Sequence, residues 1–204
     1  MSLCVLSVTT LAIAGVSMTL STTYCNGQQY YQCVQTARIA MKQIQGIINK
    51  SKLITASTQN SLLVWVEDTN RDQRINRTEM LSLRYDKQTG EIRTYRVTLP
   101  SDLAPETKTA MDTHIPLSDV TSSTMPSWLQ MESMLTNQLL ASNVTDFGLK
   151  VSPTAPLANL AEILIKVTSE ARSLTLRSGS FLRGDMTRHV GTAGGQYVLD
   201  TEGI

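Results

Sequence analysis

The sequence predicts an α+β fold in which one long N-terminal helix packs on an antiparallel β-sheet, with a helical insertion in the sheet region. The first third of the 204-residue chain is largely apolar, since no Lys or Arg precedes Arg38 and no Asp or Glu precedes Glu67. Beyond residue 52, short runs of alternating apolar and polar residues, typical of half-buried strands, are separated by turn residues. A chain of this length suits one domain with a substantial core.

Residues 3–20 (LCVLSVTTLAIAGVSMTL) form an uncharged apolar run. As a helix the run spans about 27 Å, close to the hydrocarbon thickness of a bilayer. Its Ser and Thr hydroxyls can donate hydrogen bonds to the preceding helical turn. A cleaved signal peptide would need basic residues before the run. A buried helix of a soluble domain would be an unusual use of so long an uncharged terminus, so a membrane anchor fits best.

An amphipathic helix follows over residues 33–51. Its apolar residues recur every three or four positions with polar residues between them: Val34, Ala37, Met41, Ile44 and Ile48. We therefore divide an N-terminal helix over residues 1–52 into two parts. Residues 1–24 form a membrane or filament-core part, and residues 33–51 lay their apolar stripe on a head domain.

Three cysteines, Cys4, Cys25 and Cys33, are an odd number, so they cannot all pair within the chain. In one continuous helix, Cys25 and Cys33 are separated by roughly 12 Å along the axis, which is too far for a disulfide. A turn at Asn26-Gly27 would bring them together. The sequence leaves both alternatives open.

A β-rich head domain is expected over residues 53–184. Gly90 suits the positive φ of a hairpin loop at residues 86–90. The expected strands are residues 62–66, 81–85, 92–99, 144–151, 163–167 and 173–176.

Three segments of the head and tail lack strand signals. Residues 100–126 are polar and show no convincing period. The helical spacing of residues 128–141 predicts the helical insertion around Trp128. Residues 185–204, rich in Gly and Thr, are expected to form a flexible C-terminal tail.

The sharpest local motif is a twelve-residue segment that follows the calcium-loop pattern. Side-chain oxygens occupy positions 1, 3, 5 and 9, an Ile occupies position 8, and a Glu occupies position 12. Such a loop turns alternate side chains inward around one cation, which relieves the repulsion between three carboxylates. The candidate ligands are Asp68, Asn70, Asp72, the carbonyl of Arg74, Asn76 and Glu79.

Position 6 of this loop departs from the pattern. It is Gln73 where Gly is usual, and a left-handed conformation there costs about 1 kcal/mol. The flanks are predicted strands, so this would be a calcium loop inserted in a hairpin. The alternative is a polar hairpin loop that is rich in Asp and Asn. Calcium binding, if present, is expected to be of the weak extracellular kind, with a dissociation constant on the order of 10⁻⁴ to 10⁻³ M.

We expect no enzymatic activity. The two histidines, His114 and His189, lack metal-ligand spacing to a partner, and the sequence has no nucleophile elbow, P-loop or dinucleotide fingerprint. The formal net charge of +1 gives no electrostatic reason to expect nucleic acid as a partner.

The chain resembles the type IV pilin superfamily, most closely the minor pilins and the W- or J-like pseudopilins of type II secretion. The start MSLCVL resembles a mature pilin just after leader cleavage, with Met1, Ser2, Leu3 and Leu6 at matching positions. The resemblance extends to about Gly184. Four segments resemble successive head-domain strands, in order: SLLVWVEDTNRDQRI, LSLRYDKQTGEIRTYRV, NVTDFGLKV and SLTLRSGSFLRG.

Two features depart from the family pattern. Pilins usually carry Glu at position 5, which is thought to neutralise the N-terminal amine of a neighbouring subunit. Val5 cannot do so, which suits a subunit at a filament tip. No basic leader ending in Gly precedes Met1, so either the leader is missing from the sequence or the true start lies upstream.

Small residues in the N-terminal helix offer a face for a neighbouring backbone: Ala12, Ala14, Gly15 and Ser17.

The resemblance implies a structural subunit that helps to initiate or cap a type IV pilus or a type II secretion pseudopilus, and methylation of that subunit. Its implied partners are other pilin-like subunits, the inner-membrane assembly machinery and the membrane. The implied location is the bacterial inner membrane, with a single spanning helix and a periplasmic or extracellular head. The first alternative is a membrane-anchored, calcium-stabilised extracytoplasmic binding domain that does not polymerise. The second is a membrane-tethered enzyme.

Overall fold

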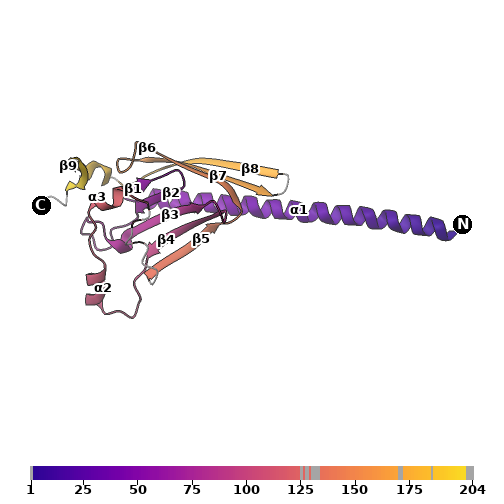
Figure 1. The fold of residues 1–204 in the computed structure, drawn as a ribbon, viewed down its shortest axis with the longest axis horizontal. Helices are drawn as coiled ribbons and strands as arrows, with labels where there is room; N and C mark the ends of the chain where they lie inside the picture. Colours follow the sequence, from indigo (N-terminus) through magenta and orange to yellow (C-terminus); the bar gives the residue numbers. More distant parts are fainter. Residues whose placement is uncertain are drawn as a thin grey trace.

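A computed structural model describes residues 2–124, 126, 129, 134–169, 172–184 and 186–200, with the backbone alone for residues 2–12. One long helix begins at one end of the molecule and runs into a β-rich head, and residues 190–199 lie at the opposite end (Figure 1). The α+β class with a long N-terminal helix and antiparallel sheets is as predicted.

The head contains two main antiparallel sheets and a small hairpin. The first sheet has the order β1-β2-β3-β4-β5, the second has the order β6-β7-β8, and β9 pairs with β10. The elements of the first sheet region are α1 (Ser2–Lys50), β1 (Leu53–Ser57), β2 (Ser61–Trp65), η1 (Arg77–Glu79), β3 (Met80–Asp86), β4 (Glu91–Val97), α2 (Pro105–Met111), α3 (Leu117–Thr121) and β5 (Leu135–Ala141). They are followed by β6 (Val144–Ser152), β7 (Leu160–Ser169), β8 (Arg172–Phe181), η4 (Met186–His189), β9 (Val190–Ala193) and β10 (Gln196–Leu199).

Helix α1 is continuous, so the chain makes no turn at Asn26-Gly27. Cys25 and Cys33 are free thiols, as the continuous-helix alternative requires. The C-terminal half of α1 packs against β7, β8 and β5, whereas the N-terminal half extends away from the head (Figure 1).

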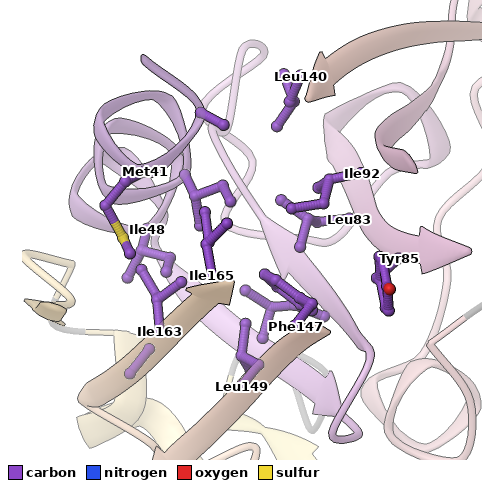
Figure 2. Close-up of a cluster of buried hydrophobic side chains, with 14 of the residues drawn as sticks. Met41, Ile48, Leu83, Tyr85, Ile92, Leu140, Phe147, Leu149, Ile163 and Ile165 are labelled. Atoms are coloured by element: carbon purple, nitrogen blue, oxygen red, sulfur yellow. The ribbon is translucent and has the colours of Figure 1, made fainter. Parts of the chain in front are cut away.

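The main core fills the space between α1 and the two sheets. The amphipathic stripe predicted in α1 is the buried face: Ala37, Ile44 and Ile48 have no exposed surface, and Val34 and Met41 have 7% each. The close-up in Figure 2 shows Met41 and Ile48 facing Ile163 and Ile165 of β7, with Phe147 and Leu149 of β6 beside them. Leu83, Ile92 and Leu140 complete the core from the first sheet.

A second core lies on the other face of the first sheet. Strand β2 serves both, because Leu62 and Val64 point to the main core while Leu63 and Trp65 point to the second. Burial on both faces explains why residues 62–65 (LLVW) are continuously apolar instead of alternating. The second core is closed by residues of α3, η4 and β10: Leu117, Val120, Met186 and Leu199.

The helical insertion lies earlier in the chain than predicted. Residues 135–141 form β5, which pairs with β4, and the short helices α2 and α3 lie within the stretch that had seemed irregular. Trp128 itself lies outside the described residues. The apolar spacing of residues 135–141 suits a helix, but these residues are extended. In the extended form their backbone groups form hydrogen bonds with the outer edge of β4.

The segment expected to be a flexible tail has a different structure over residues 186–200. It forms η4 and the β9–β10 hairpin, and Leu199 is fully buried against α3. The chain enters this segment at Gly184, whose backbone lies against Lys52. A Cβ atom there would meet the Lys52 Cα at 2.5 Å, so only glycine permits this approach.

The β3–β4 hairpin forms as predicted, with Gly90 at φ +66°. The turn end of this hairpin is tied to β6, because the Tyr85 hydroxyl donates to the Val144 carbonyl at 3.0 Å in a buried position. Burial, reinforced by the nearby carboxylates of Asp146 and Asp86, raises the pKa of the Tyr85 hydroxyl above its ordinary 10.0.

We predict that Tyr85→Phe lowers the free energy of unfolding by about 1 kcal/mol at neutral pH, because a buried carbonyl loses its donor. A phenol with a raised folded-state pKa contributes fully below about pH 10, and the contribution is lost as pH rises towards the folded-state value. Denaturant unfolding between pH 7 and 11 should therefore show a smaller alkaline loss in Tyr85→Phe than in the wild type. Tyr95→Phe, at a half-buried site, is the control. An identical alkaline loss in wild type and Tyr85→Phe would contradict this assignment.

Candidate functional site

Two regions carry the predicted site residues: the loop of residues 68–79 between β2 and β3, and the projecting part of α1. The loop gathers oxygen-bearing side chains around the Asp72 backbone. The Asp72 amide donates to Asp68 Oδ1 at 3.1 Å and to Asn70 Oδ1 at 3.2 Å. Its carboxylate accepts the side-chain amides of Asn70 at 2.7 Å and Asn76 at 3.3 Å. Four of the six predicted ligands therefore lie in one hydrogen-bonded group.

The loop turns through two left-handed residues, Arg71 (φ 61°) and Gln73 (φ 57°). Gln73 thus adopts the conformation that Gly usually supplies at position 6 of a calcium loop. Asp68 Oδ2 accepts the Gln73 amide at 3.3 Å, and Asp72 Oδ1 accepts the Arg74 amide at 2.8 Å. These bonds offset the strain of about 1 kcal/mol per left-handed residue.

Glu79 closes the loop from a fully buried position. Its Oε1 accepts the Thr69 amide at 2.6 Å and the Thr69 hydroxyl at 3.0 Å. Its Oε2 accepts the Trp65 indole N–H at 3.0 Å and the Asn76 amide at 3.4 Å. A buried carboxylate needs such partners, because an unpaired one would carry a large desolvation cost.

A cation from the chain itself already faces the loop. Lys52, which follows α1, places its Nζ 3.3 Å from Asp68 Oδ2, and the Asp68 side chain is only 3% exposed. The same ammonium lies 5.4 Å from the centre of the Trp65 ring. Lys52 therefore connects the end of α1 to the loop and to the second core.

The three loop carboxylates do not converge on one point. Over the residues that the structure describes, no group of three or more His, Cys, Asp and Glu side chains is close enough to hold a metal ion. Glu79 is directed to Trp65 and Thr69, while Asp68 is directed to Lys52. The candidate ligand atoms are all oxygens, which Ca²⁺ prefers. To bind the ion, however, Asp68 would have to give up its ion pair with Lys52.

The predicted assembly residues lie at the far end of α1 from the head. Met1 falls outside the described residues, and Leu3, Val5, Leu6 and Ala12 belong to the first turns of the helix (Figure 1). Gly15 is exposed, and a Cβ atom there would meet no atom within 4 Å.

The small residues do not share one face of this helix. Successive residues of an α-helix are about 100° apart, so Ala14 and Gly15 point in different directions and Ser17 lies roughly opposite Gly15. The predicted face of small residues is therefore not a single surface. The regular feature of this part of α1 is the spacing of its large apolar side chains, and not the position of its small residues.

An exposed apolar seam runs along the projecting part of α1. We use this name for five exposed side chains, which are 61–74% accessible: Ile13, Val16, Leu20, Tyr24 and Tyr31. Their spacing of three, four, four and seven residues follows a 3.5-residue repeat. The buried positions of the same helix continue the repeat at 34, 37, 41, 44 and 48. The seam and the buried positions therefore belong to one repeat. In a straight α-helix this repeat turns gradually around the axis, by about 20° per seven residues, so the seam is rotated from the face that the head buries.

Hydroxyl groups of the projecting helix bond to its own backbone. Thr19, Thr22 and Thr23 each donate to the carbonyl four residues earlier, at 2.9, 2.7 and 2.9 Å. This bonding lowers the cost of covering them with apolar groups.

Across the described residues, no helix is both long enough and apolar enough to cross a membrane.

Of the two histidines, His114 lies against the backbone of the loop and His189 lies elsewhere in the head. His114 Nδ1 lies 3.2 Å from the Ile75 carbonyl, and Asn76 and His114 form an isolated β-bridge. His189 is exposed beside Asp200, at 3.8 Å. His114 therefore contacts the loop backbone, and His189 contacts an acidic side chain at the surface.

Three residues of the loop site were not identified from the sequence: Lys52, Trp65 and Thr69. Thr69 lies in the motif but at a position that contributes no ligand to the pattern. Lys52 and Trp65 precede the motif, and only the packing of β2 beside the end of α1 places them there. A Trp on an otherwise aliphatic strand was the one available signal, because a buried indole N–H needs an acceptor.

We predict that Glu79→Gln lowers the free energy of unfolding by roughly 2–3 kcal/mol, because an amide would present a donor to groups that are all donors. Glu67→Gln is the matched control, since its bond to Arg96 is exposed. That control should change stability by less than about 0.5 kcal/mol. Denaturant unfolding of the full chain in detergent measures both, and equal effects would mean that the Glu79 network does not hold the loop.

Scans against protein-family models, curated proteins and solved structures find no match to this chain.

Proposed function

We propose that this chain is a structural, pilin-like subunit that assembles through the exposed half of α1 and displays the head. The single observation that carries the proposal is the apolar seam. Large apolar side chains on one face of a projecting helix are costly in water, and exposed apolar patches of this kind mark interaction surfaces. In the proposed arrangement, neighbouring helices cover the seam.

The spacing of the seam residues supports a helical partner. A 3.5-residue apolar repeat favours packing against another helix at a shallow crossing angle. Residues on the opposite side of the projecting helix are more polar, for example Thr22, Asn26 and Gln29. Met18 is an exception, because it is exposed but lies off the seam. This sidedness favours a partner helix over a uniform lipid environment.

The resemblance to minor pilins and pseudopilins suggests the setting. The subunit would initiate or cap a type IV pilus or a type II secretion pseudopilus, anchored in the bacterial inner membrane with its head outside the cytoplasm. Its partners would be other pilin-like subunits and the assembly machinery. The competing proposal, a membrane-anchored binding domain that does not polymerise, predicts an anchor without a preferred face.

Matched substitutions at adjacent helix positions separate these two proposals. We predict that Leu20→Lys, on the seam, lowers co-purification with pilin-like subunits at least tenfold, whereas Ser21→Lys, about 100° around the helix, changes it less than threefold. If the helix served only as an anchor, both charges would weaken membrane attachment alike, because the bilayer centre penalises Lys by about 2.5–3.5 kcal/mol whichever way it faces. Crosslinking of full-length chains in membranes measures both outcomes. Equal loss from the two variants would support the simple anchor.

We also propose that the loop of residues 68–79 binds Ca²⁺ weakly. The supporting observation is the grouping of Asp68, Asn70, Asp72 and Asn76 around a turn with a left-handed residue at position 6. Lys52 competes for Asp68, so calcium would bind as the ammonium moves away. The calcium-bound loop would stabilise the second core through Glu79 and Trp65.

We predict that Ca²⁺ raises the melting temperature of the full chain, since only the folded loop gathers the ligands. Asp72→Asn should abolish the response. Lys52→Met should shift the half-maximal response to lower Ca²⁺, because it removes the competing ammonium. Asp102→Asn, on an exposed turn, is the control. No response up to roughly 10 mM Ca²⁺, ten times the weak extracellular range, would contradict calcium binding.

A further inference from the structure

Strand β8 is the edge of the second sheet. Its ten residues, Arg172–Phe181, pair with β7 without any shift of register, from Leu160↔Phe181 to Ser169↔Arg172. In the part of the chain that the structure describes, no strand pairs with the other side of β8. Since antiparallel strands direct the N–H and C=O groups of alternate residues away from a given neighbour, this edge offers a regular set of donors and acceptors.

The other sheet edges are shorter, irregular or covered. The β1–β2 and β4–β5 pairs each contain a register shift, which bends the edge strand. Strand β6 is partly covered by loops, because the amides of Leu149 and Val144 donate to the carbonyls of Gln59 and Gly90. Strand β8 has none of these protections, and it contains no Pro.

Helix α1 holds β8 in place. The Gln45 side chain donates to Ser178 Oγ at 2.6 Å, and Ser180 Oγ donates to Asn49 Oδ1 at 2.7 Å. At the other end of the strand, the Arg172 guanidinium lies 5.8 Å from the centre of the Tyr30 ring. Because its backbone is already fixed, β8 would lose little conformational entropy on pairing with a further strand.

Charge and shape indicate what the edge would bind. From Arg172 to Arg183 the chain contains three Arg and no acidic residue, and Arg177 is exposed in the middle of β8. Gly179, two residues further along β8, has no side chain to cover Leu160 of β7. A Cβ atom at Gly179 would lie 3.7 Å from Leu160 Cδ1. Leu160, Leu164, Arg177 and Gly179 line a shallow hollow of about 700 Å³ on this face. Its charged lining residues are Arg177, Lys150 and Glu162, two cations and one acid. Phe181, 68% exposed, lies at the far end of the strand.

We propose that β8 is a strand-addition site for an extended, acidic segment of a partner protein. The segment adds an antiparallel or parallel strand to the second sheet, places a carboxylate beside Arg177, and places a bulky apolar side chain over Gly179 against Leu160. Main-chain hydrogen bonds supply binding, and these two side-chain positions supply selectivity. A second copy of β8 is a poor occupant, because the pair would bring four Arg together with no acid. This site does not depend on the role of the exposed seam of α1.

The test is selection from a phage-displayed library of random ten-residue peptides on the full-length chain in detergent. Acidic peptides with alternating β-branched or aromatic residues should be enriched. Synthetic versions of the selected peptides should slow amide hydrogen exchange at alternate residues of β8 and leave β6 unchanged. Arg177→Glu should weaken their binding roughly five- to tenfold, the size expected for reversing one cross-strand charge pair. Arg183→Glu, which makes the same charge change beyond the end of β8, should weaken binding less than twofold.

Three results would overturn the proposal. The first is enrichment of peptides without an acidic bias, or of none. The second is equal weakening by Arg177→Glu and Arg183→Glu, which would indicate attraction by overall charge alone. The third is exchange protection of β8 that rises with protein concentration in the absence of peptide, which would identify a second copy of the chain as the occupant.

Discussion

The burial of the apolar stripe of α1 between the two sheets is the interaction on which the rest of the structure depends. Ala37, Ile44 and Ile48 are fully buried there, and each of the two Ile side chains contributes roughly 1.5–3 kcal/mol relative to exposure. The first sheet, the second sheet and the helix share one core, so none of the three can bury its apolar face without the other two. The helix also fixes β8 through Ser178 and Ser180, and its end positions Lys52 beside the loop of residues 68–79.

The apolar residues of α1 are buried in one part of the helix and exposed in the other. Over residues 34–48 the apolar repeat meets the head, and over residues 13–31 the same repeat is exposed. A helix that keeps its period past the end of its own domain has a surface suited to another helix. This is the physical basis of the proposed assembly role, and it follows from the period of the side chains and not from their overall hydrophobicity.

The head presents two further features that are independent of the helix surface. The loop of residues 68–79 concentrates carboxylate and amide oxygens at one end of the second core, where Glu79 and Trp65 link it to the sheet. The edge of β8 lies on the second sheet and presents backbone groups with Arg side chains. In the proposed assembly, the helix would supply attachment, the loop would adjust the stability of the head, and the β8 edge would select a partner.

Sequence alone determined the features that depend on local pattern. The period of Val34 to Ile48 predicted the buried face of α1, the strands expected at residues 81–85 and 92–99 correspond to β3 and β4, and Gly90 predicted the turn between them. Four of the six oxygen ligands that the twelve-residue motif predicted form one hydrogen-bonded group, whereas Glu79 is directed to Trp65 and Thr69. These succeed because neighbours in sequence are neighbours in space.

Tertiary structure decided what depends on distant partners. Residues 135–141 are extended because β4 offers them a hydrogen-bonded edge, although their spacing suits a helix. Residues 186–200 are packed because α3 and the second core offer Leu199 a place, although their composition suggests a loose tail. The pairing of Lys52 with Asp68, and of Trp65 with Glu79, joins residues that are 16 and 14 positions apart. No local period encodes such contacts, since the free energy that selects them comes from burial and hydrogen bonding across the fold.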